Sequence, residues 1–266
     1  MNRAPVGIFD SGIGGLTVAR AIYERLPRES TIYFGDTARV PYGPKSPDTV
    51  KRYSLEILRW LLDQGVKAVV VACNTSTAHA LRALQEATPV PVLGVIKPGA
   101  RAAIAAGGAG PIGVIGTTGT IASDAYNRAI QALAPGLPVI QRACPLFVPF
   151  VEEGWFDHPA TELVAADYLR ELREACVRSL VLGCTHYPLL KPLLQRVMGP
   201  EVRLIDSGQA TAAALETILA DRALEAPGEA RPNHRFVVSD DEARFRQVGS
   251  RFIGERLGKA EVIPLG

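Results

Sequence analysis

Several features are scarce or absent in this 266-residue sequence, and each absence excludes a class of protein. No apolar run approaches the roughly 20 residues that a membrane-spanning helix needs. The net charge is only +2, so there is no electrostatic reason to expect nucleic acid or a membrane surface as a partner. A predicted strand begins at Val6, which leaves no room for a signal peptide before it, and we therefore expect a cytoplasmic protein.

Cysteine is also scarce. The four cysteines form no CxxC pair, and there is no HExxH motif or clustered Cys/His spacing, so we expect no metal site. In a cytoplasmic chain the cysteines are predicted to be free thiols rather than disulfides. Cys144 and Cys176 are assigned to packing, because Cys176 continues the apolar helical spacing of Leu169 and Leu172.

Motifs for nucleotide binding and for serine hydrolysis are missing. The glycine-rich segment after Asp10 fails the GxGxxG pattern, because Thr17 occupies the position of the last glycine. Neither GxxxxGK[ST] nor a GxSxG elbow occurs. What remains is an ordinary globular composition, 47% hydrophobic and 21% charged, in a chain long enough for one large domain or two small ones.

Apolar runs alternate with amphipathic segments along the whole chain. Ten runs are predicted to be strands: Val6–Phe9, Thr31–Phe34, Ala68–Ala72, Val92–Ile96, Ile112–Ile115, Val139–Arg142, Ser179–Leu182, Arg203–Ile205, Arg235–Val238 and Glu261–Ile263. Continuous Val/Ile/Leu runs are typical of parallel sheets buried on both faces. Helical spacing predicts helices at Asp48–Gln64, capped by Gly65, and at Thr161–Val177. This alternation predicts a doubly wound α/β fold.

An internal repeat relates the two halves of the chain. Gly7-Ile8-Phe9-Asp10-Ser11-Gly12 parallels Gly113-Val114-Ile115-Gly116-Thr117-Thr118, and Cys73 parallels Cys184 at a similar separation. We therefore predict two pseudo-symmetric α/β units, the first formed by residues 1–97 and 208–266 and the second by residues 98–207. The Ala- and Gly-rich segment Ala102–Gly110 is interpreted as the crossover. Because open α/β sheets carry ligands at their strand ends, the active site is predicted in the cleft between the units.

Cys73 and Cys184 are the strongest catalytic candidates. Each ends an apolar strand and is followed by small polar residues, in Ala72-Cys73-Asn74-Thr75 and Gly183-Cys184-Thr185-His186. Either one alone could be a small apolar core residue, but the equivalent pair favours two acid/base groups that treat both faces of a carbon alike. A free thiol titrates near ~8.5, so bringing its pKa near neutrality takes about 2 kcal/mol. Helix N-terminal N–H groups or a nearby histidine can supply that stabilisation.

Other turns at predicted strand ends supply candidate ligand groups. Asp10-Ser11-Gly12-Ile13-Gly14-Gly15 is interpreted as a cradle for a small zwitterion, with Asp10 pairing an ammonium group. Pro41-Tyr42-Gly43-Pro44 is a rigid turn, and the hydroxyls of Thr117-Thr118-Gly119-Thr120 could bind a carboxylate. An ordinary turn is the alternative for each of these segments. His186, two residues after Cys184, is predicted to assist that thiol.

Together these residues resemble the glutamate racemase family, within the aspartate/glutamate racemase superfamily. The resemblance covers nearly the whole chain, in family order, and is carried by the segments Phe9-Asp10-Ser11-Gly12-Ile13-Gly14-Gly15-Leu16, Pro41-Tyr42-Gly43, Ala72-Cys73-Asn74-Thr75, Gly183-Cys184-Thr185-His186-Tyr187-Pro188 and Ile205-Asp206-Ser207. It implies cofactor-independent interconversion of L- and D-glutamate, supplying D-glutamate for peptidoglycan, by a homodimer.

The resemblance also implies roles for individual residues. Cys73 would handle the proton of the D enantiomer and Cys184 that of the L enantiomer, and Asp10, Glu152 and His186 would assist the thiols. Substrate contacts are implied for Asp10, Ser11, Pro41, Tyr42, Gly43, Asn74, Thr75, Thr117, Thr118, Thr185 and His186. Glu152 is chosen over Glu153 from its Pro-x-x-Glu context, and His186 favours glutamate over aspartate. An aspartate, hydantoin or other superfamily racemase, and a non-catalytic amino-acid-binding protein, remain as alternatives.

Overall fold

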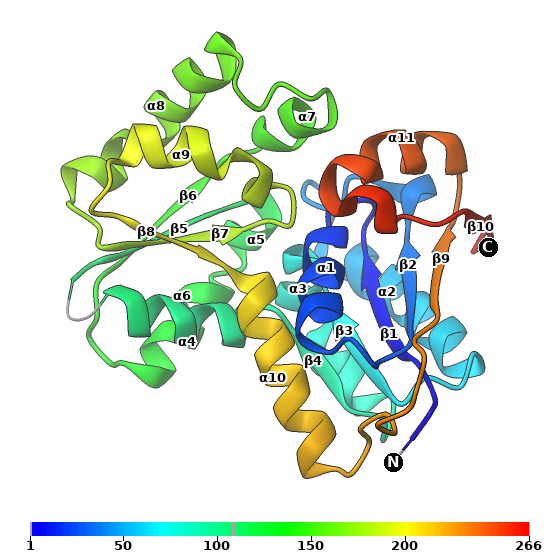
Figure 1. Ribbon diagram of the computed structural model, residues 1–266. Coiled ribbons are helices and arrows are strands. Elements are labelled where there is room, and N and C mark those ends of the chain that lie inside the picture. The colour runs from blue at the N-terminus through cyan, green and yellow to red at the C-terminus, as the bar shows by residue number, and fades with distance from the viewer. Residues whose placement is uncertain (1, 108–109, 266) are drawn as a thin grey trace.

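Two parallel β-sheets, each with helices on both faces, form the molecule (Figure 1). The computed structural model describes residues 2–107 and 110–265. The first sheet has the order β10-β9-β2-β1-β3-β4, with β1 Val6–Asp10, β2 Thr31–Gly35, β3 Ala68–Val71, β4 Val92–Gly94, β9 His234–Val238 and β10 Ala260–Val262. The second has the order β6-β5-β7-β8, with β5 Ile112–Gly116, β6 Val139–Ala143, β7 Ser179–Gly183 and β8 Arg203–Asp206. All ten predicted strands are confirmed, and every pairing is parallel.

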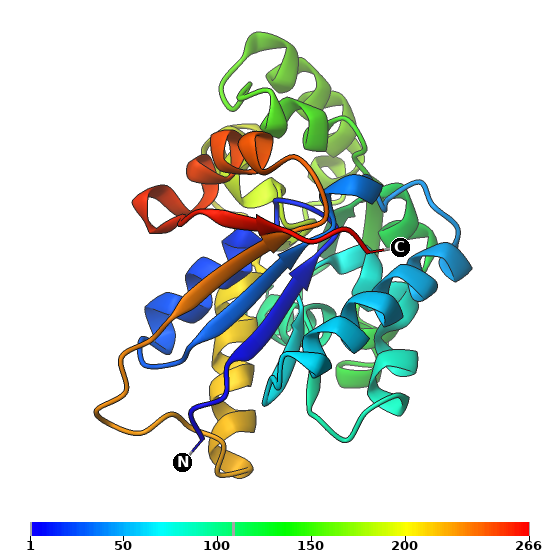
Figure 2. The same cartoon turned by 90° about the vertical axis from the view of Figure 1, so that its right-hand side faces the viewer.

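The two sheets share one strand order. β2-β1-β3-β4 in the first sheet corresponds to β6-β5-β7-β8 in the second. In this correspondence β1 matches β5 and β3 matches β7, as the repeat predicts. Cys73 and Cys184 therefore follow equivalent strands. The tail adds β9 and β10 to the first sheet beyond β2 (Figure 2).

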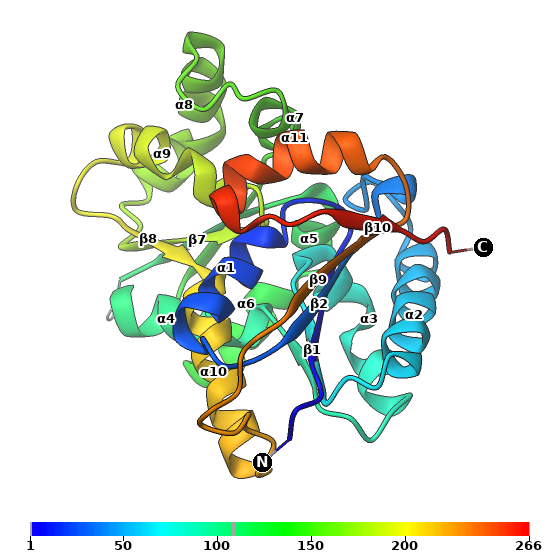
Figure 3. The ribbon, with the colours of Figure 1, turned by 45° about the vertical axis from the view of Figure 1, so that its right-hand side comes forward.

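Eleven α-helices and three short 3-10 helices cover the sheets in the described part of the chain. They are α1 Leu16–Arg25, α2 Pro47–Asp63, α3 Asn74–Glu86, α4 Ile96–Gly107, α5 Thr118–Ala122, α6 Ala125–Leu133, α7 Phe147–Glu152, α8 Pro159–Glu174, α9 Lys191–Met198, α10 Ser207–Asp221, α11 Glu242–Ile253, η1 Thr37–Arg39, η2 Tyr187–Leu190 and η3 Gly254–Arg256. Helices α2 and α3 pack on one face of the first sheet, and α1, α10 and α11 lie on the other (Figures 2 and 3). Helices α4 and α6 cover one face of the second sheet, with α8 and α9 opposite. None of these helices combines the length and apolar character that a membrane span requires.

The helix predictions hold with one correction. Ala102 to Gly107 lie between β4 of the first sheet and β5 of the second, where the crossover was expected, and they form the last turns of α4; Gly108 and Ala109 lie outside the described residues. Cys176 is exposed instead of packed. Helix α8 ends at Glu174, and Cys176 then takes a left-handed conformation (φ 51°) in a Schellman-type turn that directs its side chain outward.

Burial of Cys144 agrees with its assignment to packing, and Gly65 has the positive φ (71°) of a helix cap.

One large apolar cluster runs through both lobes of the molecule. It joins residues of α1 and β1 to residues of β7, α8 and α9. Helix α10 packs against both α1 and α4, so it links the helical layers of the two sheets. The two sheets are thereby held with their strand ends facing one another.

A buried ion pair lies just before the N-terminal end of β3. Lys67 Nζ lies 2.6 Å from Glu29 Oε2, and both side chains are almost fully buried. Lys67 also donates to the carbonyl of Asn2, and Glu29 accepts from the backbone N–H of Ala226. The pair therefore ties the N-terminal segment and the chain after α10 to the first sheet.

We predict that Lys67→Met lowers the free energy of unfolding by about 3–5 kcal/mol, because it leaves the Glu29 charge buried without a partner. Urea unfolding followed by circular dichroism measures the loss. The exposed pair of Arg82 and Glu86 supplies the control, since Arg82→Met should leave the free energy of unfolding almost unchanged. If Lys67→Met lowered the free energy of unfolding as little as Arg82→Met does, the buried pair would contribute nothing to stability.

Candidate active site

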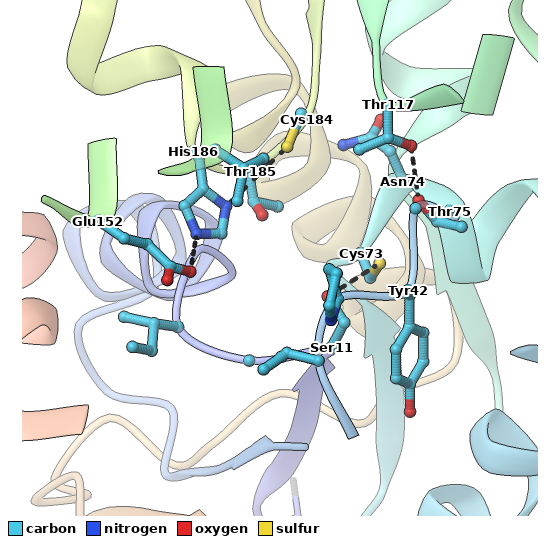
Figure 4. Close-up of a pocket in the computed structure, with 16 residues that line it drawn as sticks. Ser11, Tyr42, Cys73, Asn74, Thr75, Thr117, Glu152, Cys184, Thr185 and His186 are labelled. Atoms are coloured by element: carbon cyan, nitrogen blue, oxygen red, sulfur yellow. Dashed lines mark hydrogen bonds and ion pairs between the residues drawn. The ribbon is translucent and has the colours of Figure 1, made fainter. Parts of the chain in front are cut away.

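A small cavity lies between the strand ends of the two sheets and holds both candidate thiols (Figure 4). Its volume is about 50 Å³, room for only a few water molecules. It is lined by Ser11, Gly12, Ile13, Val40, Pro41, Tyr42, Gly43, Cys73, Asn74, Thr75, Thr117, Val148, Glu152, Cys184, Thr185 and His186. The cavity thus brings together Cys73, Cys184 and most of the predicted substrate contacts.

Cys73 occupies the N-cap position of α3. Its Sγ accepts a hydrogen bond from the backbone N–H of Ser76 at 3.4 Å, and lies 3.6 Å from the Ser11 hydroxyl. Burial, together with the nearby Asp10 carboxylate, nevertheless raises the pKa of Cys73 to about 11, against the opposing effect of these donors. Desolvation therefore outweighs the donors at a single helix terminus, and these donors do not by themselves bring the pKa of Cys73 near neutrality.

Cys184 follows β7 and has a different helper. Its Sγ lies 3.9 Å from Nδ1 of His186, and Nε2 of the same ring lies 3.1 Å from Oε1 of Glu152. Burial lowers the pKa of His186, but interactions with Cys184 and Glu152 outweigh it and raise the pKa to about 10. The imidazole is therefore held as a cation between two groups that can carry negative charge.

The structure places Glu152, rather than Glu153, against His186. Burial raises the pKa of Glu152, but the interactions with His186 and Arg244 lower it further, so the net shift is downward. Glu153 is mostly exposed and has only a 3.9 Å contact with Arg244. Figure 4 shows the Glu152 carboxylate and the His186 ring pointing toward each other.

Asp10 has a position different from the predicted one. It is fully buried and does not line the cavity. Its carboxylate accepts from the N–H of Gly12 at 2.9 Å and from the Thr185 hydroxyl at 3.4 Å. Burial raises its pKa, with His186 and the N–H donors opposing. In this geometry Asp10 holds the glycine-rich turn and Thr185 in place, rather than facing a substrate ammonium.

Thr118 is the other predicted contact that the structure does not bring into the cavity. It lies on an adjoining, more open hollow of about 390 Å³, which also includes Pro44, Pro145 and Pro149. The reason is that Thr117 is the N-cap of α5 and points its hydroxyl inward. The next residue starts the helix and faces the other way.

Asn74 presents an unused hydrogen-bond donor in the cavity wall. Its Oδ1 accepts from the hydroxyl of Tyr126 at 2.7 Å, while its Nδ2 is buried without a partner among the described residues. Buried amide groups normally have partners, so this donor is suited to a substrate oxygen. Tyr126 comes from α6 of the second sheet, and no signal in the sequence near Asn74 predicts it.

Contacts between the sheets fix the remaining lining residues. The Thr75 hydroxyl lies 2.9 Å from that of Thr117, and the N–H of Gly119 donates to the carbonyl of Gly43 at 2.9 Å. The Tyr42 hydroxyl donates to the buried Asp36 carboxylate. Sequence analysis missed Asp36, although it follows a strand in Gly35-Asp36 as Asp10 does.

Gly14 allows the close approach of the glycine-rich turn to the second sheet. A Cβ at this position would lie 2.3 Å from the Thr185 hydroxyl and 2.4 Å from Nδ1 of His186. We predict that Gly14→Ala displaces the imidazole and lowers kcat by about 10²-fold, the scale of losing a general acid/base contribution. Steady-state kinetics measures this. Gly228→Ala meets no atom within 4 Å and should leave kcat unchanged; equal behaviour of the two variants would contradict the prediction.

Known proteins are similar to this chain in sequence and in structure. Residues 14–215 match the family model described as Asp/Glu/Hydantoin racemase. This chain belongs to that family. Racemases are isomerases, so this chain is an isomerase.

The similar proteins include glutamate racemases from several bacteria. The curated glutamate racemase of Geobacter metallireducens is 54% identical over 260 residues, covering 98% of this chain and 96% of that protein. The crystal structure of a glutamate racemase isoform from Bacillus anthracis has a TM-score of 0.94 at 40% identity, covering 100% of this chain and 98% of the other. The glutamate racemase of Francisella tularensis in complex with D-glutamate has a TM-score of 0.93 at 38% identity, covering 100% and 99%. These similarities confirm the predicted family and the two-sheet α/β fold.

Proposed function

We propose that this enzyme interconverts L- and D-glutamate, and that Cys73 and Cys184 carry the proton on opposite faces of the α-carbon. The observation that carries the proposal is the pair of cysteines at the ends of equivalent strands, β3 and β7, in the wall of one cavity. Two groups are needed because one base cannot reach both faces of a tetrahedral carbon. The glutamate racemases of similar sequence and structure support glutamate as the substrate.

The proposed reaction is a deprotonation followed by a reprotonation. One cysteine, as thiolate, takes the α-proton and becomes a thiol, which leaves the electron pair on the α-carbon. The other cysteine, as thiol, then gives its proton to the opposite face and becomes a thiolate. Cys184 would act on the L enantiomer and Cys73 on the D enantiomer, and the roles exchange for the reverse direction.

The surroundings of the two thiols suit this division of charge. A raised pKa keeps Cys73 protonated at neutral pH. The imidazolium of His186 attracts negative charge on the Cys184 sulfur at 3.9 Å. Cys73 is therefore ready to donate a proton, and the cation beside Cys184 would stabilise a thiolate formed there, which suits an L-glutamate substrate. An α-ammonium bound between them would favour the thiolate on either side.

The carbanionic intermediate needs stabilisation from the chain itself, and no cofactor is part of the proposal. Asn74, Thr75 and Thr185 place donors where a carboxylate can bind, and hydrogen bonds to a developing negative charge are strong in a dry site. A cavity of about 50 Å³ is small for glutamate. We infer that residues 1–97 with 208–266 and residues 98–207 act as two units that part to admit substrate and close over it.

The biological setting is part of the same proposal. D-glutamate made by this enzyme would supply peptidoglycan synthesis in the cytoplasm, and the enzyme would act as a homodimer. An aspartate racemase is the alternative within the family, and a non-catalytic glutamate-binding protein is the alternative outside it. Neither is favoured by a particular contact in the cavity.

One experiment separates these possibilities. The purified protein is incubated with L-glutamate in D₂O without added cofactor, and in parallel with L-aspartate. Loss of the α-proton is followed by NMR and inversion by circular dichroism. We expect both with glutamate, at a rate far above that with aspartate. Binding of glutamate without exchange of its α-proton would overturn the proposed activity.

A further inference from the structure

The helper pair of Cys184 is completed by a helix that belongs to the other sheet. Glu152 ends α7, in the layer of the second sheet, whereas α11 lies between β9 and β10 of the first (Figure 3). Arg244 Nη2 lies 3.2 Å from Glu152 Oε2. Arg251 Nη1 donates to the Glu152 carbonyl at 2.8 Å. The Phe252 ring stands edge-on to the His186 ring, with 5.5 Å between centroids.

These contacts use both oxygens of one carboxylate. Oε1 of Glu152 bonds His186, and Oε2 bonds Arg244 on the opposite side. A carboxylate held at both oxygens cannot rotate freely, so the guanidinium determines the direction in which Oε1 points. Arg251 fixes the backbone of the same residue. Helix α11 therefore constrains the side chain and the main chain of Glu152 together.

We propose that Arg244 is a positioning residue for the reaction, holding Glu152 so that His186 stays aligned with Cys184. This inference rests on the two-thiol function proposed above. The Cys73 thiol donates to the Ser11 hydroxyl and accepts from the N–H of Ser76, and both partners lie within the first unit. Loss of Arg244 should therefore impair only the Cys184 half of the proton transfer.

The size of the effect follows from the exposure of the groups. The charged groups that face Glu152 are His186 and Arg244 at its carboxylate and Arg251 at its carbonyl, and Glu153 is a competing anion 3.9 Å from the Arg244 guanidinium. Arg244 is 51% exposed, so solvent and salt screen its charge. Because of this screening, we expect the loss of Arg244 to lower kcat moderately, by about three- to tenfold.

The test compares Arg244→Gln with Arg246→Gln. Arg246 lies on the same helix and its ion pair is with Glu242, 3.7 Å away, not with Glu152. We expect Arg244→Gln to lower kcat about three- to tenfold at neutral pH, and to move the acid limb of the pH profile of kcat/KM upward. The upward direction follows because Glu152 loses a cation that favours its ionised form. Arg244→Lys should restore the position of the acid limb in part, and Arg246→Gln should match the wild type.

A second readout reports which thiol is affected. Racemisation has the same kcat/KM in both directions, because two enantiomers have equal energy in water. The primary isotope effect with α-deuterated substrates can still differ. In Arg244→Gln it should rise for L-glutamate, deprotonated by Cys184, and fall for D-glutamate. A rate loss with an unmoved acid limb and unchanged isotope effects would overturn the positioning role. Absence of α-proton exchange in the wild type would instead overturn the proposed function itself.

Discussion

Replacing either cysteine with serine should abolish nearly all racemisation. We expect Cys73→Ser and Cys184→Ser each to lose about 10³-fold or more in kcat, since a hydroxyl is a far weaker acid than a thiol and proton transfer alone contributes about 10²–10⁴-fold. Circular dichroism at a fixed wavelength follows the conversion of L-glutamate. Serine fits the space of cysteine, so the loss will not come from a disturbed fold.

The control for these variants is Cys176→Ser. Cys176 is exposed beyond the end of α8 and should show wild-type kcat. Substrate analogues that can eliminate a leaving group after one deprotonation give a further distinction, because each variant keeps one competent thiol. Each should then process one enantiomer and not the other. Full racemisation by either serine variant would contradict the two-thiol mechanism.

Much of the fold could be predicted because its determinants are local. A Val/Ile/Leu run such as Ala68–Val71 has no amphipathic alternative to a buried strand. A polar residue directly after such a run must lie at the end of a strand. This rule placed Cys73 and Cys184 correctly at the ends of two strands. The segment that begins at Ala102 lies in the connection between the two sheets, as interpreted, and its residues up to Gly107 are helical because alanine favours helix.

The features that escaped prediction depend on residues distant in sequence. Asp10 lies behind the cavity wall, where Thr185, 175 residues later, donates to it. The contact of Arg244 with Glu152 spans 92 residues. The raised pKa of Cys73 reflects burial by the whole site. No local pattern around Arg244 or Tyr126 signals these contacts, since each depends on how two sheets face one another.

The two thiols are equivalent in topology and unequal in chemistry. The strand repeat gives each cysteine the same place, at the end of β3 or β7. Cys73 then caps a helix, whereas Cys184 is followed by a 3-10 turn with His186 at its start. A helix N-terminus offers neutral N–H donors, while imidazolium offers a full charge. The symmetry therefore places the two thiols at equivalent strand ends, and its breaking gives them different neighbours.

His186→Asn should reveal this asymmetry with a large effect. We expect kcat to fall by about 10²–10³-fold, because the variant removes the cation beside Cys184 and breaks the link from that thiol to Glu152. His158 provides the matched control. It is a surface residue whose side chain caps α8, a role that asparagine can also fill, and His158→Asn should keep wild-type kcat.

The pH dependence of stability gives this prediction a second, independent measure. The pKa of His186 is about 10 in the folded protein, against about 6.5 for an unfolded histidine. A raised pKa means that the folded state binds the proton more tightly, so the resulting stabilisation is complete below about 6.5 and disappears as pH rises toward about 10. The difference in free energy of unfolding between wild type and His186→Asn should therefore shrink across that window. A difference that stayed constant with pH would show that His186 is not held as a cation, and the charge assigned to the Cys184 side would have to be abandoned.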